Sequence, residues 1–145
     1  MLVLLSKTAV GTSQSGAAIN IERPIYALFE LDVTLADTDV GDTLDVYVQH
    51  SPDSGTTWYD FVHFPQFTGT DGAGKRHIVW SGTLIPVVVT EPNPSLTPGA
   101  ETLVANTVLH GVKFSTWRGR AVIVDAGAAN ASFSFKLSAR IVQDR

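Results

Sequence analysis

Three stretches of the chain alternate hydrophobic and polar residues with a period of two, and they are residues 29–35, 44–49 and 133–141. In the last of them Phe133, Phe135 and Leu137 alternate with Ser134 and Lys136. Successive side chains of a β-strand point to opposite faces, so this pattern predicts strands with one buried and one solvated face. Three such strands favour antiparallel sheets.

Shorter strand candidates and turn signals fill most of the remaining chain. The strand candidates are residues 57–63, 76–80, 84–89, 112–116 and 121–124. The turn signals are the Asp-, Gly- and Pro-containing residues 37–42, 52–55, 69–74 and 126–131. Many short strands with regular turns are typical of a sandwich or a barrel. We predict an all-β fold, an antiparallel β-sandwich of jelly-roll or immunoglobulin-like type.

A proline-rich segment interrupts this pattern at residues 90–99, where Pro92, Pro94 and Pro98 stand close together. Proline has no N–H group for a sheet, so we expect an exposed and fairly stiff loop. After it, Pro98 fits the first position of one short helix that ends at Gly111, although β-branched residues compete with that prediction. We therefore expect an N-terminal arm (1–21) and a single sandwich domain (22–145) with an inserted loop.

The composition fits a folded domain without disulfides. The 145 residues are 44% hydrophobic and 17% charged, which is enough apolar material for a core. The absence of cysteine excludes disulfides, thiolate nucleophiles and cysteine-based zinc sites. The apolar start, Met1 to Leu5, is too short for a signal peptide, and no stretch is long enough to span a bilayer. We expect the protein to be made in a cytoplasm and to stay there until something releases it.

Charge is distributed unevenly along the sequence. Residues 22–71 contain ten acidic residues and one basic residue, whereas residues 103–145 contain six basic and two acidic residues. Two interpretations are open: strands from both segments interleave and mix the charges, or the molecule is polarised for packing against a charged surface. The sequence pI of about 5.4 and the lack of a basic run argue against nucleic-acid binding.

One hairpin turn has a clear local signature, Ser-x-Asp-x-Gly-x-Thr-Trp, formed by Ser51, Asp53, Gly55, Thr57 and Trp58. It resembles the Asp-box of sialidases and related propellers, in which the aspartate accepts hydrogen bonds from turn amides and the tryptophan packs beneath. The chain has one copy and is too short for a propeller. We therefore interpret these residues as turn architecture and expect no sialidase activity.

A glycine-rich segment, residues 69–75, has the Gly-x4-Gly-Lys spacing of a phosphate-binding loop. The next residue is Arg76, where magnesium binding needs Ser or Thr. The residues that follow have the pattern of a strand, not of a helix whose N-terminus could bind phosphate. A simple glycine-rich loop is the better interpretation.

Four aspartates, Asp37, Asp39, Asp42 and Asp45, lie within nine residues. The spacing of the first two is similar to that of calcium-binding loops, but the bidentate glutamate that closes an EF-hand loop is missing. We interpret the segment as a solvated turn between two strands and predict no metal.

The histidines, His50, His63, His77 and His110, form no metal-binding pair in sequence, although His63 and His77 could face each other across the glycine-rich loop. No Gly-x-Ser-x-Gly elbow marks a serine hydrolase. We expect no catalytic residues, no cofactor and no enzymatic activity.

The strand and turn pattern resembles small β-sandwich virion proteins of tailed bacteriophages. The resemblance lies in residues 31–34 (LDVT), 41–49 (GDTLDVYVQ), 51–53 (SPD), 57–61 (TWYDF), 119–124 (GRAVIV) and 131–137 (ASFSFKL). It implies a structural role on the particle, most plausibly capsid decoration (cement), or a place at the head–tail junction or in the tail. The proline-rich loop departs from a minimal sandwich.

From this resemblance, with which the composition agrees, we expect a non-enzymatic virion protein that is assembled in a host cytoplasm and binds the capsid surface as an oligomer. The expected partners are copies of itself, with a trimer favoured, and a major capsid protein, but no nucleic acid and no membrane. Candidate assembly contacts are the 1–21 arm and Pro92, Pro94 and Pro98. Deletion of either segment is expected to abolish particle binding and to leave the domain folded. The alternative is a carbohydrate-binding sandwich, in which exposed Trp58, Tyr59, Trp80 and Trp117 would stack on sugars.

Overall fold

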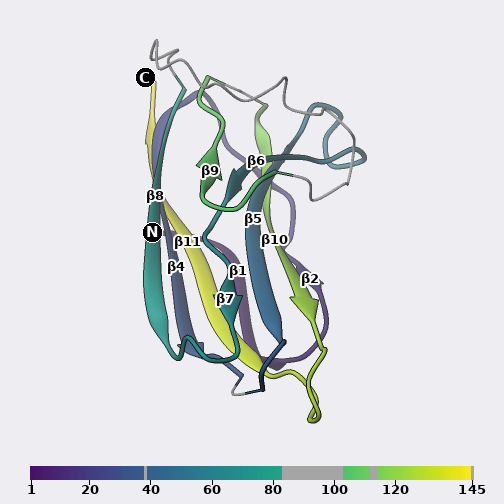
Figure 1. Ribbon diagram of the computed structural model, residues 1–145. Helices are drawn as coiled ribbons and strands as arrows, with labels where there is room; N and C mark the ends of the chain where they lie inside the picture. The colour runs from purple at the N-terminus through teal and green to yellow at the C-terminus, as the bar shows by residue number, and fades with distance from the viewer. Residues whose placement is uncertain (38, 83–102, 112–113, 145) are drawn as a thin grey trace.

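Two antiparallel β-sheets pack face to face in the computed structural model, which describes residues 1–37, 39–82, 103–111 and 114–144 (Figure 1). The strands are β1 (Leu2–Val10), β2 (Gln14–Ser15), β3 (Ile19–Asn20), β4 (Pro24–Leu35), β5 (Thr43–Ser51), β6 (Tyr59–His63), β7 (Phe67–Thr68), β8 (Gly74–Ser81), β9 (Thr107–Val108), β10 (Thr116–Val124) and β11 (Phe133–Gln143). The described ranges contain no helix that could cross a membrane. The predicted all-β antiparallel β-sandwich is confirmed.

The strand order places distant segments side by side. One sheet has the order β1-β11-β4-β8, and the other has the order β2-β10-β5-β6-β9, with β3 paired to β10 and β7 paired to β5. The loops β4–β5 and β10–β11 each pass from one sheet to the other. The two loops therefore both close the sandwich, and they lie at the same end of it (Figure 1).

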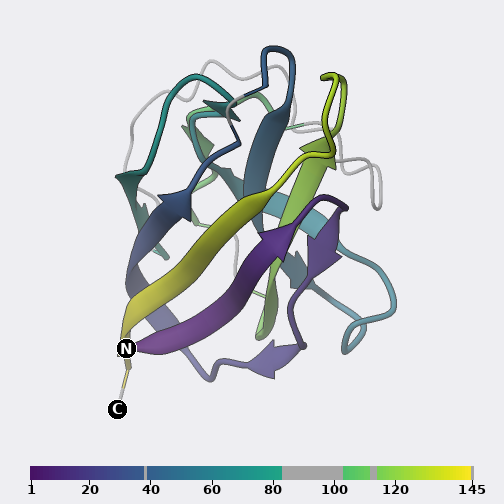
Figure 2. The ribbon, with the colours of Figure 1, turned by 90° about the horizontal axis from the view of Figure 1, so that it is seen from below.

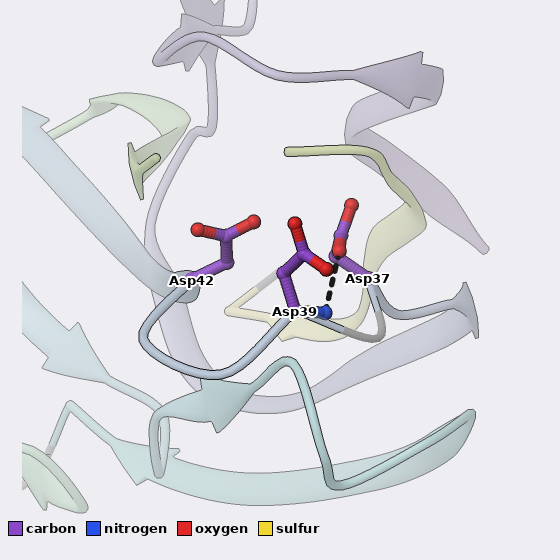
Figure 3. A group of neighbouring side chains, drawn as sticks. All are labelled: Asp37, Asp39 and Asp42. Carbon is purple, nitrogen blue, oxygen red and sulfur yellow. Dashed lines mark hydrogen bonds between the residues drawn. The ribbon is translucent and has the colours of Figure 1, made fainter. Parts of the chain in front are cut away.

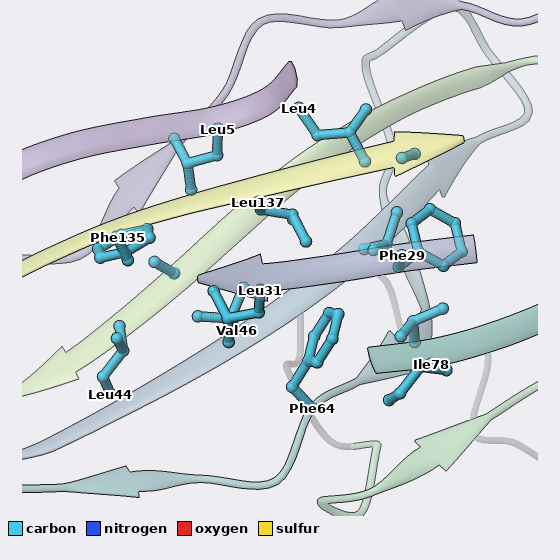
Figure 4. Close-up of a cluster of buried hydrophobic side chains, with 14 of the residues drawn as sticks. Leu4, Leu5, Phe29, Leu31, Leu44, Val46, Phe64, Ile78, Phe135 and Leu137 are labelled. Carbon is cyan, nitrogen blue, oxygen red and sulfur yellow. The ribbon is translucent and has the colours of Figure 1, made fainter. Parts of the chain in front are cut away.

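The core lies between the sheets, and strands such as β4 contribute every second side chain to it. In β4, Ala27, Phe29 and Leu31 are completely buried. They lie with Leu137 of β11 and Val46 of β5 in one hydrophobic cluster, whose side chains fill the space between the sheets (Figure 4). Each such large side chain stabilises the fold by roughly 1.5–3 kcal/mol relative to leaving it in water.

An aromatic cluster fills the other part of the core. The rings of Trp80 and Trp117 meet edge to face with centroids 5.3 Å apart, and Phe61 lies 5.0 Å from Trp117. The indole N–H of Trp80 donates to the carbonyl of Leu109, and that of Trp117 donates to the carbonyl of Phe114. A buried tryptophan needs such a partner, so both indoles are satisfied inside the fold.

The N-terminal residues belong to the sandwich, and the prediction of a separate 1–21 arm is wrong. Strand β1 pairs with β11 along most of its length, and the two lie side by side in Figure 2. Leu4, Leu5 and Ile21 are buried in the core. Deleting this segment would remove an edge strand and expose the core, so a deletion cannot leave the domain intact.

Other sequence predictions have mixed outcomes. The long alternating stretches fall in β4, β5 and β11, and the predicted strand at 76–80 falls in β8. In the described part of the predicted strand at 112–116, residues 114–116, only Thr116 lies in a strand, where it begins β10. In the described part of the predicted helix, Thr107–Val108 forms a strand paired with β6 instead, as its β-branched residues favour. Residues 84–89 and the 90–99 loop with Pro92, Pro94 and Pro98 lie outside the described residues.

Candidate functional site

One half of the outer face of the β1-β11-β4-β8 sheet carries four apolar side chains, with the exposed Arg140 of β11 beside them as a partner of Leu28. Because Ala27 and Phe29 of β4 point into the core, Tyr26 and Leu28 point outward. The pairing register places Tyr26 beside Val142 of β11 and Leu28 beside Val79 of β8. Tyr26, Val79 and Val142 are 40%, 44% and 52% exposed. We call Tyr26, Leu28, Val79 and Val142 the apolar strip.

The other half of the same outer face is charged. Lys75 Nζ lies 3.1 Å from Asp32 and 3.6 Å from Glu30, and His77 Nε2 lies 3.0 Å from Glu30. The hydrogen bond from His77 lowers the pKa of Glu30, with help from the charge of Lys75. These pairs are exposed to solvent, where ion pairs contribute little to stability. They leave a solvated, charged surface beside the apolar strip.

The acidic and basic segments of the sequence mix in space. Strand β4, from the acidic segment, pairs with β11 from the basic one, so that Asp32 lies opposite Lys136. In the other sheet β5 pairs with β10, which places Asp45 opposite Val122 and near Arg120 of the same strand. The structure therefore favours the first of the two interpretations, interleaved charge, over a polarised molecule.

The turn at residues 51–58 has the contacts that its sequence predicts. Asp53 Oδ1 accepts hydrogen bonds from the N–H groups of Thr56 and Thr57 and from the hydroxyl of Ser51. These bonds lower the pKa of Asp53 to about 2, with the backbone bond from Thr57 as the largest cause. Gly55 has a φ of 104°, in the left-handed region that glycine favours.

Trp58 completes this turn and is buried. Its indole N–H donates to the carbonyl of Gly55 at 2.9 Å, and the guanidinium of Arg118 lies 4.1 Å from its ring centroid. Both the N–H group and the ring of this indole thus have partners within the fold. The five predicted architectural residues, Ser51, Asp53, Gly55, Thr57 and Trp58, meet in this one turn.

The histidines have structural partners rather than each other. His63 in β6 donates from Nδ1 to the carbonyl of Leu103 at 2.6 Å, and its Nε2 lies 3.0 Å from Asp45 Oδ1. Burial raises the pKa of Asp45, but the hydrogen bonds from His63 and Gln66 outweigh this and lower it. His77 lies in the other sheet and contacts Glu30 instead, so the two histidines form no joint site.

The predicted solvated turn between β4 and β5 is different in the structure. We call residues 36–42 the acidic loop. Asp37, Asp39 and Asp42 each place one carboxylate oxygen within 4.8 Å of the others (Figure 3), whereas Asp45 contacts His63. Asp42 is completely buried, so the prediction of solvent exposure is wrong for this residue. At such distances two carboxylates repel each other by on the order of 3 kcal/mol at an effective dielectric constant of 20.

Backbone amides hold the acidic loop in place. Asp42 Oδ1 accepts hydrogen bonds from the N–H groups of Ala126 and Gly127 at 2.8 and 2.7 Å. Asp39 Oδ2 accepts one from Ala129 at 2.7 Å, and Asp37 Oδ1 accepts one from Asp39 at 2.8 Å. Among the described residues, Asp42 Oδ2 is buried without a hydrogen-bond partner. The sequence indicated the cluster of aspartates but not the 125–132 loop that buries it.

A hollow of about 430 Å³ opens where β1, β3 and β11 meet. It is lined among others by Met1, Ile19 and Ile141, and Arg140 is the one charged side chain in its lining. Two carboxylates on either side of a sugar are the usual requirement for glycoside hydrolysis, and this lining has neither. The hollow does not support a glycosidase site.

The glycine-rich segment forms a turn that leads into β8, as predicted, and β8 is a strand. A helix N-terminus, which a phosphate-binding loop requires, does not follow it.

Comparison of the chain with protein-family models, with curated proteins and with solved structures finds no significant match.

Proposed function

We propose that this domain works by assembly, as a structural component of a tailed-bacteriophage virion that decorates the capsid surface as an oligomer. Its partners in this proposal are copies of itself, with a trimer favoured, and a major capsid protein. The resemblance of its strand and turn pattern to phage β-sandwich proteins suggests the setting. The observation that carries the assembly role is the apolar strip on the outer face of the β1-β11-β4-β8 sheet.

The apolar strip is contiguous across three neighbouring strands. Tyr26 and Val142 are direct partners in the sheet, as are Leu28 and Val79, and Tyr26 and Leu28 are two residues apart on one face of β4. Exposed apolar groups that cluster in this way mark interaction surfaces. An aromatic residue within an aliphatic patch is typical of the centre of a protein interface. A second copy of the chain is the occupant that we propose.

The carbohydrate-binding alternative depends on exposed aromatic side chains. Trp58, Trp80 and Trp117 are all buried, and their indole N–H groups bond to backbone carbonyls. Tyr59 is half-buried and lies against His50. A sugar-stacking platform made of these residues is therefore disfavoured, and burial of the tryptophans supports the structural role.

The test of assembly is the oligomeric state of the whole chain, measured by light scattering coupled to size-exclusion chromatography. Val79→Glu and Val142→Glu each place a charge in the apolar strip. We expect the unmodified chain to form an oligomer and each variant to shift it toward monomer, because burying an unpaired carboxylate is costly.

The matched control is Val124→Glu, since Val124 is 47% exposed at the end of β10, in the other sheet. This variant should assemble like the unmodified chain. A monomeric unmodified chain, or equal effects of all three substitutions, would refute the role of the apolar strip.

The position on the particle is tested by antibody labelling of virions in electron micrographs. Label on the capsid supports decoration, and label at the neck or tail supports a connector or tail component.

A further inference from the structure

The acidic loop contains a buried carboxylate oxygen whose charge nothing described in the structure balances. Asp42 has no exposed surface, and its Oδ2 has no hydrogen-bond partner among the described residues. One carboxylate oxygen of each of Asp37, Asp39 and Asp42 lies within 4.8 Å of those of the other two, and Figure 3 shows the three side chains next to one another. We propose that this cluster is a calcium-binding site, with Asp37, Asp39 and Asp42 as its ligands.

A cation is needed because, among the described residues, no ion pair joins a positive side chain to Asp37, Asp39 or Asp42. Lys75, His63 and His77 pair with other carboxylates instead. The backbone amides near Asp42 are already used by its other oxygen, Oδ1. A buried carboxylate without a partner is strongly unfavourable, whereas a cation satisfies it together with its two neighbours.

The donor atoms select a hard divalent cation. All three ligands are carboxylates, and calcium prefers six to eight oxygen ligands in an irregular arrangement. Softer transition metals favour imidazole or thiolate, which none of the three residues offers. Magnesium demands a near-ideal octahedron and keeps its water, so a loop of closely spaced aspartates suits calcium better. Water and backbone carbonyls would supply its remaining ligands.

The site would join the two loops that close one end of the sandwich. The acidic loop connects β4 to β5, and the 125–132 loop connects β10 to β11. Their contact is close: a side chain at Gly127 would place its Cβ 2.6 Å from the Cβ of Asp39. The ion binds Asp42 and Asp39. These two residues in turn accept hydrogen bonds from the N–H groups of Gly127 and Ala129. Calcium therefore stabilises the link between both sheets at this end.

The test is calorimetric titration of the full chain, after treatment with a chelator, with calcium up to about 10 mM, which exceeds the weakest class of natural sites. We expect one ion per chain and a melting temperature that rises with calcium, since a ligand that binds the folded state stabilises it. Asp37→Asn and Asp39→Asn should each weaken binding at least tenfold. In both variants the asparagine keeps a side-chain oxygen that can accept the hydrogen bond from the backbone N–H group. The same holds for Asp42→Asn.

Removal of one negative charge gives a second readout, the melting temperature without calcium, which a loss of folding could not raise. In chelator, Asp37→Asn and Asp39→Asn should melt above the unmodified chain because repulsion is reduced, and in calcium they should melt below it. Asp53→Asn is the matched control, because Asp53 also accepts turn amides but lies beyond the opposite end of β5 from the acidic loop. It should bind calcium as the unmodified chain does. No heat of binding and no thermal shift up to 10 mM, or an equal shift with magnesium, would overturn the proposal.

Discussion

The stability of the domain should depend on pH through His50, a buried residue of β5. His50 is 2% exposed, and its Nδ1 is buried without a hydrogen-bond partner among the described residues. Its ring stacks on Phe114 at 4.7 Å and meets Phe61 edge-on at 5.1 Å. Burial in these aromatic surroundings lowers the pKa of His50 from 6.5 to about 4.

The sign and size of the effect follow from proton linkage. Because the folded-state pKa of His50 is lowered, the unfolded chain binds more protons than the folded chain between pH 6.5 and 4. Stability therefore falls as the pH falls through this window. The full effect is about 3 kcal/mol at 1.36 kcal/mol for each tenfold change in proton affinity. At pH 5 about 2 kcal/mol of it has been lost relative to pH 8.

The perturbation that tests this is His50→Phe, which keeps an aromatic ring and removes the titrating nitrogens. Urea unfolding at pH 8, 7, 6 and 5 measures the free energy of unfolding for the variant and the unmodified chain. We expect their difference to change by about 2 kcal/mol in favour of His50→Phe between pH 8 and pH 5. The control is Val48→Ala, which alters another buried residue of β5 but no titrating group; it should lower the free energy of unfolding equally at each pH. If the free energy of unfolding depends on pH equally in His50→Phe and in the unmodified chain, the reasoning is refuted.

Two further predictions concern packing and the hairpin turn. Gly119→Ala would place a Cβ 2.8 Å from the Cβ of Leu5 and 3.0 Å from Leu137. We expect it to lower the free energy of unfolding, measured in urea, by about 1–3 kcal/mol. Gly74→Ala, whose Cβ would have no close contact, is the control and should not lower it. The pKa of Asp53 is about 2, so its contribution to stability is present above about pH 4 and is lost toward pH 2. Asp53→Asn should flatten acid unfolding followed by tryptophan fluorescence over that range; unchanged acid transitions would contradict this.

The sequence predicted the strands in which hydrophobic and polar residues alternate and missed those that are short or interrupted. The burial alternates in β4, whereas Val46 to Ser51 of β5 are all buried and β11 also buries Ser134 and Ser138, so the predicted solvated face is only partly present in these two strands. In β1 both Leu4 and Leu5 are buried, because a register shift between Val3 and Leu5 interrupts the alternation. Strands of two residues, such as β2 and β9, are too short to show a period.

The candidate sites depend on contacts that the sequence alone does not contain. The aspartates of the acidic loop are near neighbours in the chain, so their proximity could be expected. The burial of Asp42 comes from amides more than eighty residues away, at Ala126 and Gly127. The apolar strip likewise depends on the register that sets Tyr26 beside Val142. Contacts of long range follow from topology and not from local pattern.

The position of β11 sets the order in which the protein can fold. This strand lies between β1 and β4, yet the ribosome makes it after all the other described strands. Until it emerges, β1 and β4 have no shared partner, and the hydrophobic face of their sheet stays open to solvent. Pairing at such sequence separations is slow, because a long chain must close first. Folding of the sandwich is therefore completed only after synthesis of β11, and a nascent chain halted before residue 133 is a substrate for chaperones and proteases.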